Sequence, residues 1–115
     1  MYPYICPYWK KMKSTYDHSE EPSIINRQKK FTKEEAIDIG KNIGIDFSKI
    51  DIEQFRTGLD VELEHGTRFP KANVTNDDPV LTGKIAYAHL LEIPDYYTRL
   101  AEIEKEARLH CGIED

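Results

Sequence analysis

The hydrophobic positions of the chain recur at helical spacing from residue 31 onwards. Thr32 and Glu35 form a capping box, because the side chain of each can bind the backbone amide of the other. Gly44 provides a C-terminal stop. Between these signals one face carries apolar or small residues at i, i+3, i+4 and i+7, namely Ala36, Ile39, Gly40 and Ile43. The pattern predicts a first helix that begins after Thr32 and ends near Gly44.

A second helix is predicted between Asp51 and Gly66. Asp51 precedes Gln54 by three residues and can cap the first turn, and Gly66 ends the helix. A loop over residues 67–77 follows this second helix. The apolar stripe of the helix contains Ile52, Phe55, Leu59 and Leu63.

Asp78 and Pro79 form a strong start signal for a third helix, which reaches about Glu92, because a side-chain cap precedes a proline at the first helical position. This helix is apolar nearly all round, which is typical of the centre of a bundle or of an interface. Its two apolar sides are Leu81, Ile85 and Ala88, and Val80, Tyr87 and Leu91. A fourth helix is predicted after Pro94, with the stripe Tyr96, Leu100, Ile103 and Ala107.

The fold class that follows is all-α, because no run of four or more alternating residues indicates a strand. We expect residues 31–115 to form a single helical domain, a small irregular bundle of about four helices. Residues 1–30 lack the helical period and are interrupted by Pro3, Pro7 and Pro22. We expect them to form an extended N-terminal arm, flexible or draped over the domain.

The net charge of −5 hides an asymmetry between the arm and the domain. Residues 1–30 carry six basic and three acidic side chains, whereas the other 85 residues carry ten basic and eighteen acidic ones. An acidic body argues against a general nucleic-acid-binding protein. No apolar run approaches the roughly 20 residues of a transmembrane helix, and the N-terminus lacks the apolar core of a signal peptide. The sequence therefore predicts a cytoplasmic protein.

The arm mixes aromatic residues with lysines, and it is too apolar to remain in water without a contact. We expect it to bind a protein partner or a second copy of the chain, or to fold back onto its own acidic domain, in preference to nucleic acid. The residues that we expect to make this contact are Tyr4, Tyr8, Trp9 and Lys10.

Two pairs of ligand-type residues occur in the second and third helices. Glu62 and His65 stand at i, i+3, and His89 and Glu92 repeat the pair in reverse order. If the two helices pack antiparallel, the pairs converge, and helical bundles hold zinc, iron or manganese with such Glu/His sets. Two alternatives use the same residues: a buried hydrogen-bonded network of histidine and carboxylate, and an acid/base catalytic site.

A candidate cleft follows the third helix directly. Two adjacent tyrosines cannot both face the core of one helix, so we expect Tyr97 to present its hydroxyl to a surface or cleft beside His89. Asp95 and Arg99 are the charged residues that we expect at the same cleft.

Four segments carry a resemblance to a known family: FR-x-GL-x-VELEHG at residues 55–66, NVTNDD at 73–78, LTGKIA at 81–86, and AHL-x-E-x-PDYY-x-RL at 88–100. From residue 31 to about 108 the chain resembles a family of small bacterial and phage proteins known as a domain of unknown function. The resemblance implies no activity, and it leaves the first thirty residues outside the family. A phage origin would make virion association an alternative to a cytoplasmic location.

These observations predict a small helical binding or interaction domain with a divalent-metal site formed by Glu62, His65, His89 and Glu92. The first alternative is a structural or virion-assembly protein without metal, which acts through the arm and the third helix. The second alternative is a hydrolytic or redox enzyme with two metal ions, in which Glu62 and Glu92 bridge the ions.

Overall fold

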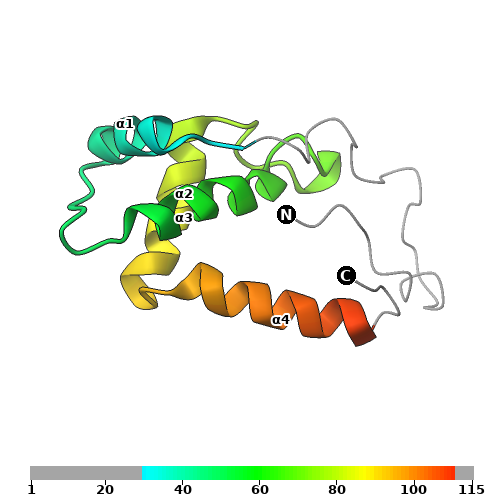
Figure 1. Ribbon diagram of the computed structural model, residues 1–115. Helices are drawn as coiled ribbons and strands as arrows, with labels where there is room; N and C mark the ends of the chain where they lie inside the picture. The colour runs from blue at the N-terminus through cyan, green and yellow to red at the C-terminus, as the bar shows by residue number, and fades with distance from the viewer. Residues whose placement is uncertain (1–29, 111–115) are drawn as a thin grey trace.

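The computed structural model describes residues 30–110, which form four α-helices and two short 3₁₀ turns and contain no strand (Figure 1). Helix α1 (Lys33–Ile43) begins at the predicted capping box. The Thr32 hydroxyl accepts from the Glu35 amide at 3.1 Å, and the Glu35 carboxylate accepts from the Thr32 amide at 2.8 Å. Gly44 ends the helix with a φ of 91°, a left-handed conformation that glycine adopts without strain.

Helix α2 (Ile52–Glu62) begins where Asp51 accepts from the Gln54 amide at 2.9 Å, as the sequence predicts. It ends four residues before Gly66, because the chain tightens at Leu63 into the 3₁₀ turn η3 (Leu63–His65). The Gly66 amide donates to the Leu63 carbonyl at 3.0 Å, the i→i+3 bond of a 3₁₀ turn. The predicted second helix is therefore an α-helix as far as Glu62 and continues as a 3₁₀ turn to His65.

The connection between α2 and α3 contains the turn η4 (Pro70–Ala72). Asp77 ties its two ends together: the carboxylate accepts from the Thr67 amide at 2.9 Å and from the Thr67 hydroxyl at 2.6 Å. Helix α3 (Pro79–Glu92) then begins at Asp78, whose carboxylate accepts from the amides of Val80 and Leu81. This start is the predicted one.

The buried face of α3 differs from the predicted stripes. It consists of Thr82, Gly83, Ala86 and Leu90, whereas Leu81 is 45% and Leu91 62% exposed. When a helix is apolar all round, its sequence pattern does not indicate which face is buried. The face of α3 that packs on the other helices is the one that carries the small side chains. The metal-site hypothesis assumed that α2 and α3 run antiparallel beside each other. Instead, α3 crosses α2 (Figure 1).

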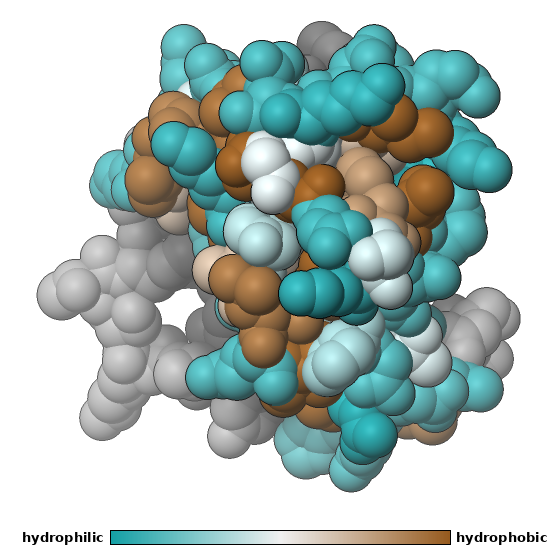
Figure 2. Space-filling view, turned by 90° about the vertical axis from the view of Figure 1, so that its left-hand side faces the viewer, coloured by the Kyte–Doolittle hydropathy of each residue, from teal (hydrophilic) through white to brown (hydrophobic). Residues whose placement is uncertain are grey.

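Helix α4 (Tyr96–His110) packs on the domain mainly through its beginning. Tyr97 is buried, whereas the predicted stripe is only partly buried at Tyr96 and Leu100 and is exposed at Ile103. No helix of the described residues is long and apolar enough to span a membrane. Figure 2 shows apolar and hydrophilic side chains interspersed on the face that it presents. The core contains Phe31, Ala36, Ile39, Ile45, Ile50, Phe55, Leu59, Val61, Leu63, Ala86, Leu90 and Tyr97.

Candidate metal centre

A buried carboxylate lies where α2 passes into η3. Glu62 is only 3% exposed, and an ionised carboxylate in such a place requires hydrogen-bond donors or counter-charges. Side chains from three elements surround it. The Tyr97 hydroxyl donates to Oε2 at 2.6 Å, His65 Nε2 lies 3.1 Å from Oε1, and His89 Nε2 lies 3.5 Å from Oε2.

The two oxygens of Glu62 therefore have different surroundings. Oε2 is held by Tyr97 of α4 and lies beside His89 of α3, whereas Oε1 faces His65 of η3. Tyr97 is buried, and burial followed by its contact with Glu62 raises the pKa of its phenol well above the usual 10. Since the phenol keeps its proton at all ordinary pH values, it acts as a permanent donor that fixes the orientation of the carboxylate.

The His89 ring is positioned by two aromatic rings at the beginning of α4. It stacks on Tyr96 with ring centroids 4.2 Å apart and planes within 6°. It also meets Tyr97 edge to face with centroids 6.3 Å apart. Such contacts limit rotation of the imidazole and leave it beside Glu62.

Glu64 completes a group of three side chains that offer metal ligands. One ligand atom from each of Glu62, Glu64 and His65 lies within 4.8 Å of the other two. The Glu64 carboxylate is 3.8 Å from His65 Nε2, and its side chain is 39% exposed. Burial, followed by the negative charge of Glu62, raises the pKa of Glu64 above its ordinary 4.5. The group is therefore partly buried and carries an excess of negative charge.

The other predicted site residues lie elsewhere. Glu92 is exposed at the last position of α3 and is not one of the three grouped ligands. The helix crossing brings His89 to Glu62 but leaves Glu92 beyond the contact. The arm residues Tyr4, Tyr8, Trp9 and Lys10 lie outside the described part of the chain.

Of the three residues that we expect at a cleft, Tyr97 faces the interior, whereas Asp95 and Arg99 lie at the surface. Tyr97 is 3% exposed and points inward to Glu62, so the neighbouring Tyr96 is the tyrosine that lies nearer the surface. The two charged residues form an ion pair along α4 instead: Arg99 Nε donates to Asp95 Oδ1 at 2.8 Å. This bond lowers the pKa of Asp95. One residue of helical phase decides which of the two adjacent tyrosines faces the core, and here it is Tyr97.

Sequence reasoning did not identify Glu64 as a site residue. On a regular α-helix Glu64 does not share a face with Glu62, and only i, i+3 or i, i+4 spacing selects neighbours there. The change to a 3₁₀ turn at Leu63 redirects its side chain. The single available signal was the acidic run Glu62-Leu63-Glu64-His65 directly before Gly66, where helices often end in a tighter turn.

Comparison with known proteins gives a family match. The model of the family described as "Protein of unknown function (DUF5661)" matches residues 36–106. This range contains every residue of the group around Glu62 and excludes the arm. No curated protein and no solved structure matches the chain.

Proposed function

Since the chain belongs to the DUF5661 family, whose description assigns no activity, its chemistry rests on its own residues, and we propose that it is a metal-binding helical domain. The ligands are Glu62, Glu64 and His65, and the ion is a divalent transition metal such as zinc, iron or manganese. The observation that carries this proposal is the gathering of these three ligand atoms within 4.8 Å of one another.

The chemistry of the donors fits such an ion. Two carboxylates and one imidazole are ligands that zinc, iron and manganese accept in proteins, with coordination positions left for water or a substrate. Tyr97 holds Glu62 Oε2, which leaves Oε1 on the side of His65 as the ligand oxygen. A hydrogen bond to the second oxygen of a ligating carboxylate is the kind of support that orients metal ligands.

The charge of the region also favours a cation. The negative charge of Glu62 contributes to the raised pKa of Glu64. Burial, followed by the charge of Glu64, raises the pKa of the partly buried Glu104 of α4. Partly buried carboxylates that repel each other are stabilised by a positive ion between them. Bound metal would supply a Lewis acid at this position, and the open coordination sites would decide what it binds or activates.

The proposal is tested by isothermal titration calorimetry of chelator-treated protein with Zn²⁺, Mn²⁺ and Fe²⁺ (the last under anaerobic conditions), with elemental analysis of protein purified without chelator. We expect one ion per chain, and at least a tenfold loss of affinity in His65→Ala and in Glu64→Gln. The matched controls His110→Ala and Glu102→Gln remove the same groups from exposed positions of α4 and should bind like the wild type. Equal binding by all four variants, or none by the wild type, would contradict the proposal.

A second candidate is a hydrogen-bonded network that needs no metal. It is favoured by the contacts that Glu62 already makes, since Tyr97 donates to one oxygen and His65 lies at hydrogen-bonding distance from the other. In that case the group stabilises the domain, and the protein functions through its surfaces. His65→Ala would then reduce the free energy of unfolding equally with and without added metal, whereas a metal site makes the loss much larger when metal is present.

A further inference from the structure

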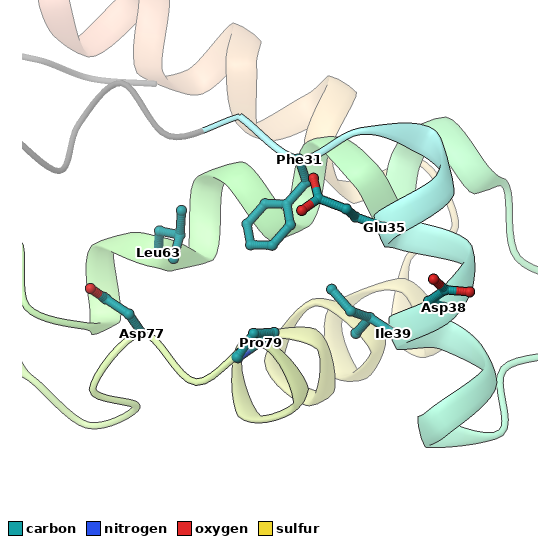
Figure 3. Close-up of a pocket in the computed structure, with 7 residues that line it drawn as sticks. All are labelled: Phe31, Glu35, Asp38, Ile39, Leu63, Asp77 and Pro79. Atoms are coloured by element: carbon teal, nitrogen blue, oxygen red, sulfur yellow. The ribbon is translucent and has the colours of Figure 1, made fainter.

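A cavity of about 450 Å³ lies between α1, the end of α2 and the start of α3 (Figure 3). Apolar side chains and three acidic residues line it, with the Asp38 and Asp77 carboxylates directed away from its centre, and no basic residue of the described chain lines it. None of the proposed metal ligands lines it either. The apolar residues are Phe31, Ile39, Leu63 and Pro79, and the acidic ones are Glu35, Asp38 and Asp77. Such a lining suits an occupant that joins an apolar group to a positive charge.

The arm enters the domain at the edge of this cavity. The Phe31 amide donates to Asp60 Oδ1 at 2.7 Å, and the Phe31 carbonyl accepts from Arg56 Nη1 at 3.3 Å. These bonds fix the Phe31 backbone to α2 while its ring lines the cavity. The point from which residues 1–30 extend is therefore fixed beside the acidic side chains.

The beginning of the arm has the complementary composition. Residues 1–13 contain four aromatic side chains and three lysines and no acidic residue. We propose that this segment docks in the cavity of its own chain. An aromatic side chain of the segment contacts the apolar residues, and the lysines that follow Trp9 face Glu35, Asp38 and Asp77.

Size and tethering support this occupant over a separate molecule. Cavities of roughly 300–1,000 Å³ enclose small ligands, so the volume is sufficient for an aromatic ring and its neighbours. The tether between Trp9 and Phe31 is roughly twenty residues long, and the free-energy cost of closing such a loop rises only with the logarithm of its length. Tethering gives the segment an effective concentration in the millimolar range, at which a weak contact is sufficient.

Trp9 provides a direct probe, because it is the single tryptophan of the chain. Tryptophan fluorescence and its quenching by acrylamide are measured in the full chain and in a synthetic peptide of residues 1–13. We expect blue-shifted emission in the full chain and a quenching constant at least threefold below that of the peptide. Asp38→Lys reverses the charge of an exposed residue at the cavity and should move both values towards those of the peptide.

The matched control is Glu34→Lys, which makes the same charge change on α1 at a position that does not line the cavity. It should leave Trp9 protected. Replacement of Lys10 and Lys11 by Glu should expose Trp9 in the wild-type background and restore protection in the Asp38→Lys background. These arm variants also test the contact if circular dichroism shows that Asp38→Lys does not fold.

Three results would overturn the proposal. The first is a tryptophan in the full chain that is quenched as readily as in the peptide. The second is an identical response to Asp38→Lys and Glu34→Lys, which would place the segment elsewhere. The third is protection that disappears on dilution of the unaltered protein, which would show that the segment occupies a second copy of the chain.

Discussion

Glu62 places a carboxylate at a nearly fully buried position, and its neighbours explain how the domain tolerates it. Tyr97 donates one short hydrogen bond to its carboxylate, and the imidazoles of His65 and His89 lie within 3.5 Å of it. A buried carboxylate that loses such a donor bears the cost of incomplete solvation. The free-energy cost of burying the Glu62 carboxylate therefore depends on side chains from η3, α3 and α4.

Tyr97→Phe removes the phenol that holds Glu62 and leaves the ring in place. We expect the free energy of unfolding to fall by about 1.5–3 kcal/mol, the usual range for a hydrogen bond to a charged group. The measurement is urea denaturation followed by circular dichroism. Tyr96→Phe removes the same hydroxyl from the adjacent ring and should change the stability by less than about 0.5 kcal/mol. Equal effects of the two variants would show that the bond to Glu62 contributes little.

Glu64 should destabilise the metal-free domain at neutral pH. Its pKa is raised in the folded state, mainly by burial, so folding favours the protonated form. Its contribution to stability is therefore complete below the ordinary glutamate pKa of 4.5 and is lost as the pH rises through the higher folded value.

Glu64→Gln removes this ionisation. In the presence of chelator at pH 7 we expect a gain of up to about 1 kcal/mol, limited because solvent screens a side chain that is 39% exposed. Thermal melts at pH 7 and pH 4 measure it, and the gain should disappear at the lower pH. The Glu102→Gln control should show no gain at either pH. The same Glu64→Gln substitution that stabilises the metal-free protein should weaken metal binding.

The helices of this domain meet at small residues. A Cβ atom at Gly58 of α2 would lie 2.5 Å from Cε2 of Tyr97 and 3.0 Å from Cβ of Ala86 in α3. On α3 itself, Thr82 is fully buried, and its hydroxyl has a partner there because it donates to the Asp78 carbonyl of the same helix at 2.7 Å. These small or internally bonded side chains allow α2, α3 and the beginning of α4 to approach one another, and this approach brings Tyr97 to Glu62.

Gly58→Ala tests the helix contact. Alanine should gain about 1 kcal/mol from its helix propensity, but its methyl group overlaps a ring edge and a second helix, and overpacking costs about 1–3 kcal/mol. We expect a net loss of stability of about 1 kcal/mol, measured by denaturation, together with weaker metal binding because Tyr97 is displaced. Gly83→Ala is the comparison, since its methyl group would lie 2.8 Å from Cγ2 of Ile39 and from Cδ1 of Ile43 and 3.3 Å from Cζ of Phe55, so it overpacks the core without touching Tyr97. A loss of stability with unchanged metal binding is the expected contrast, because only the methyl group at Gly58 displaces Tyr97.

The accuracy of the sequence interpretation differs between helices for a physical reason. The starts of α1, α2 and α3 depend on side chains within three residues of the backbone amides that they cap, and the end of α1 depends on the left-handed Gly44, so they were predictable. The buried face of α3 depends on which neighbour contacts it, and an apolar helix offers several faces. The inward turn of Tyr97 was likewise decided by the packing of α4 on α2.

Over the whole molecule, the proposed metal site links elements that are distant in the chain. Its ligands lie at the end of α2 and in η3, while Glu62 is held by Tyr97, which lies 35 residues further along in α4. An ion that binds the folded domain more tightly than the unfolded chain stabilises it by mass action. Binding should therefore protect the domain as one cooperative unit, and not only the turn η3.

Zn²⁺ at a free concentration of 100 times its dissociation constant should raise the free energy of unfolding by about 2.7 kcal/mol. Differential scanning calorimetry with and without chelator measures this shift as a single transition. The shift should be absent in His65→Ala. It should shrink as the pH falls, because protons compete for the ligands. A shift of equal size in His65→Ala would place the bound ion elsewhere.

The sequence by itself determined the helical class, the starts of α1, α2 and α3, the end of α1, the charge difference between arm and domain, and the pairing of Glu62 with His65. Each of these follows from composition or from residues a few positions apart, and their interactions do not depend on residues distant in the chain. Only the tertiary structure decided that α3 crosses α2, that Tyr97 turns inward, that Glu64 replaces Glu92 beside Glu62, and that a cavity opens where the arm joins. These features depend on how closely small residues let the helices approach, and that distance is a property of the packed molecule.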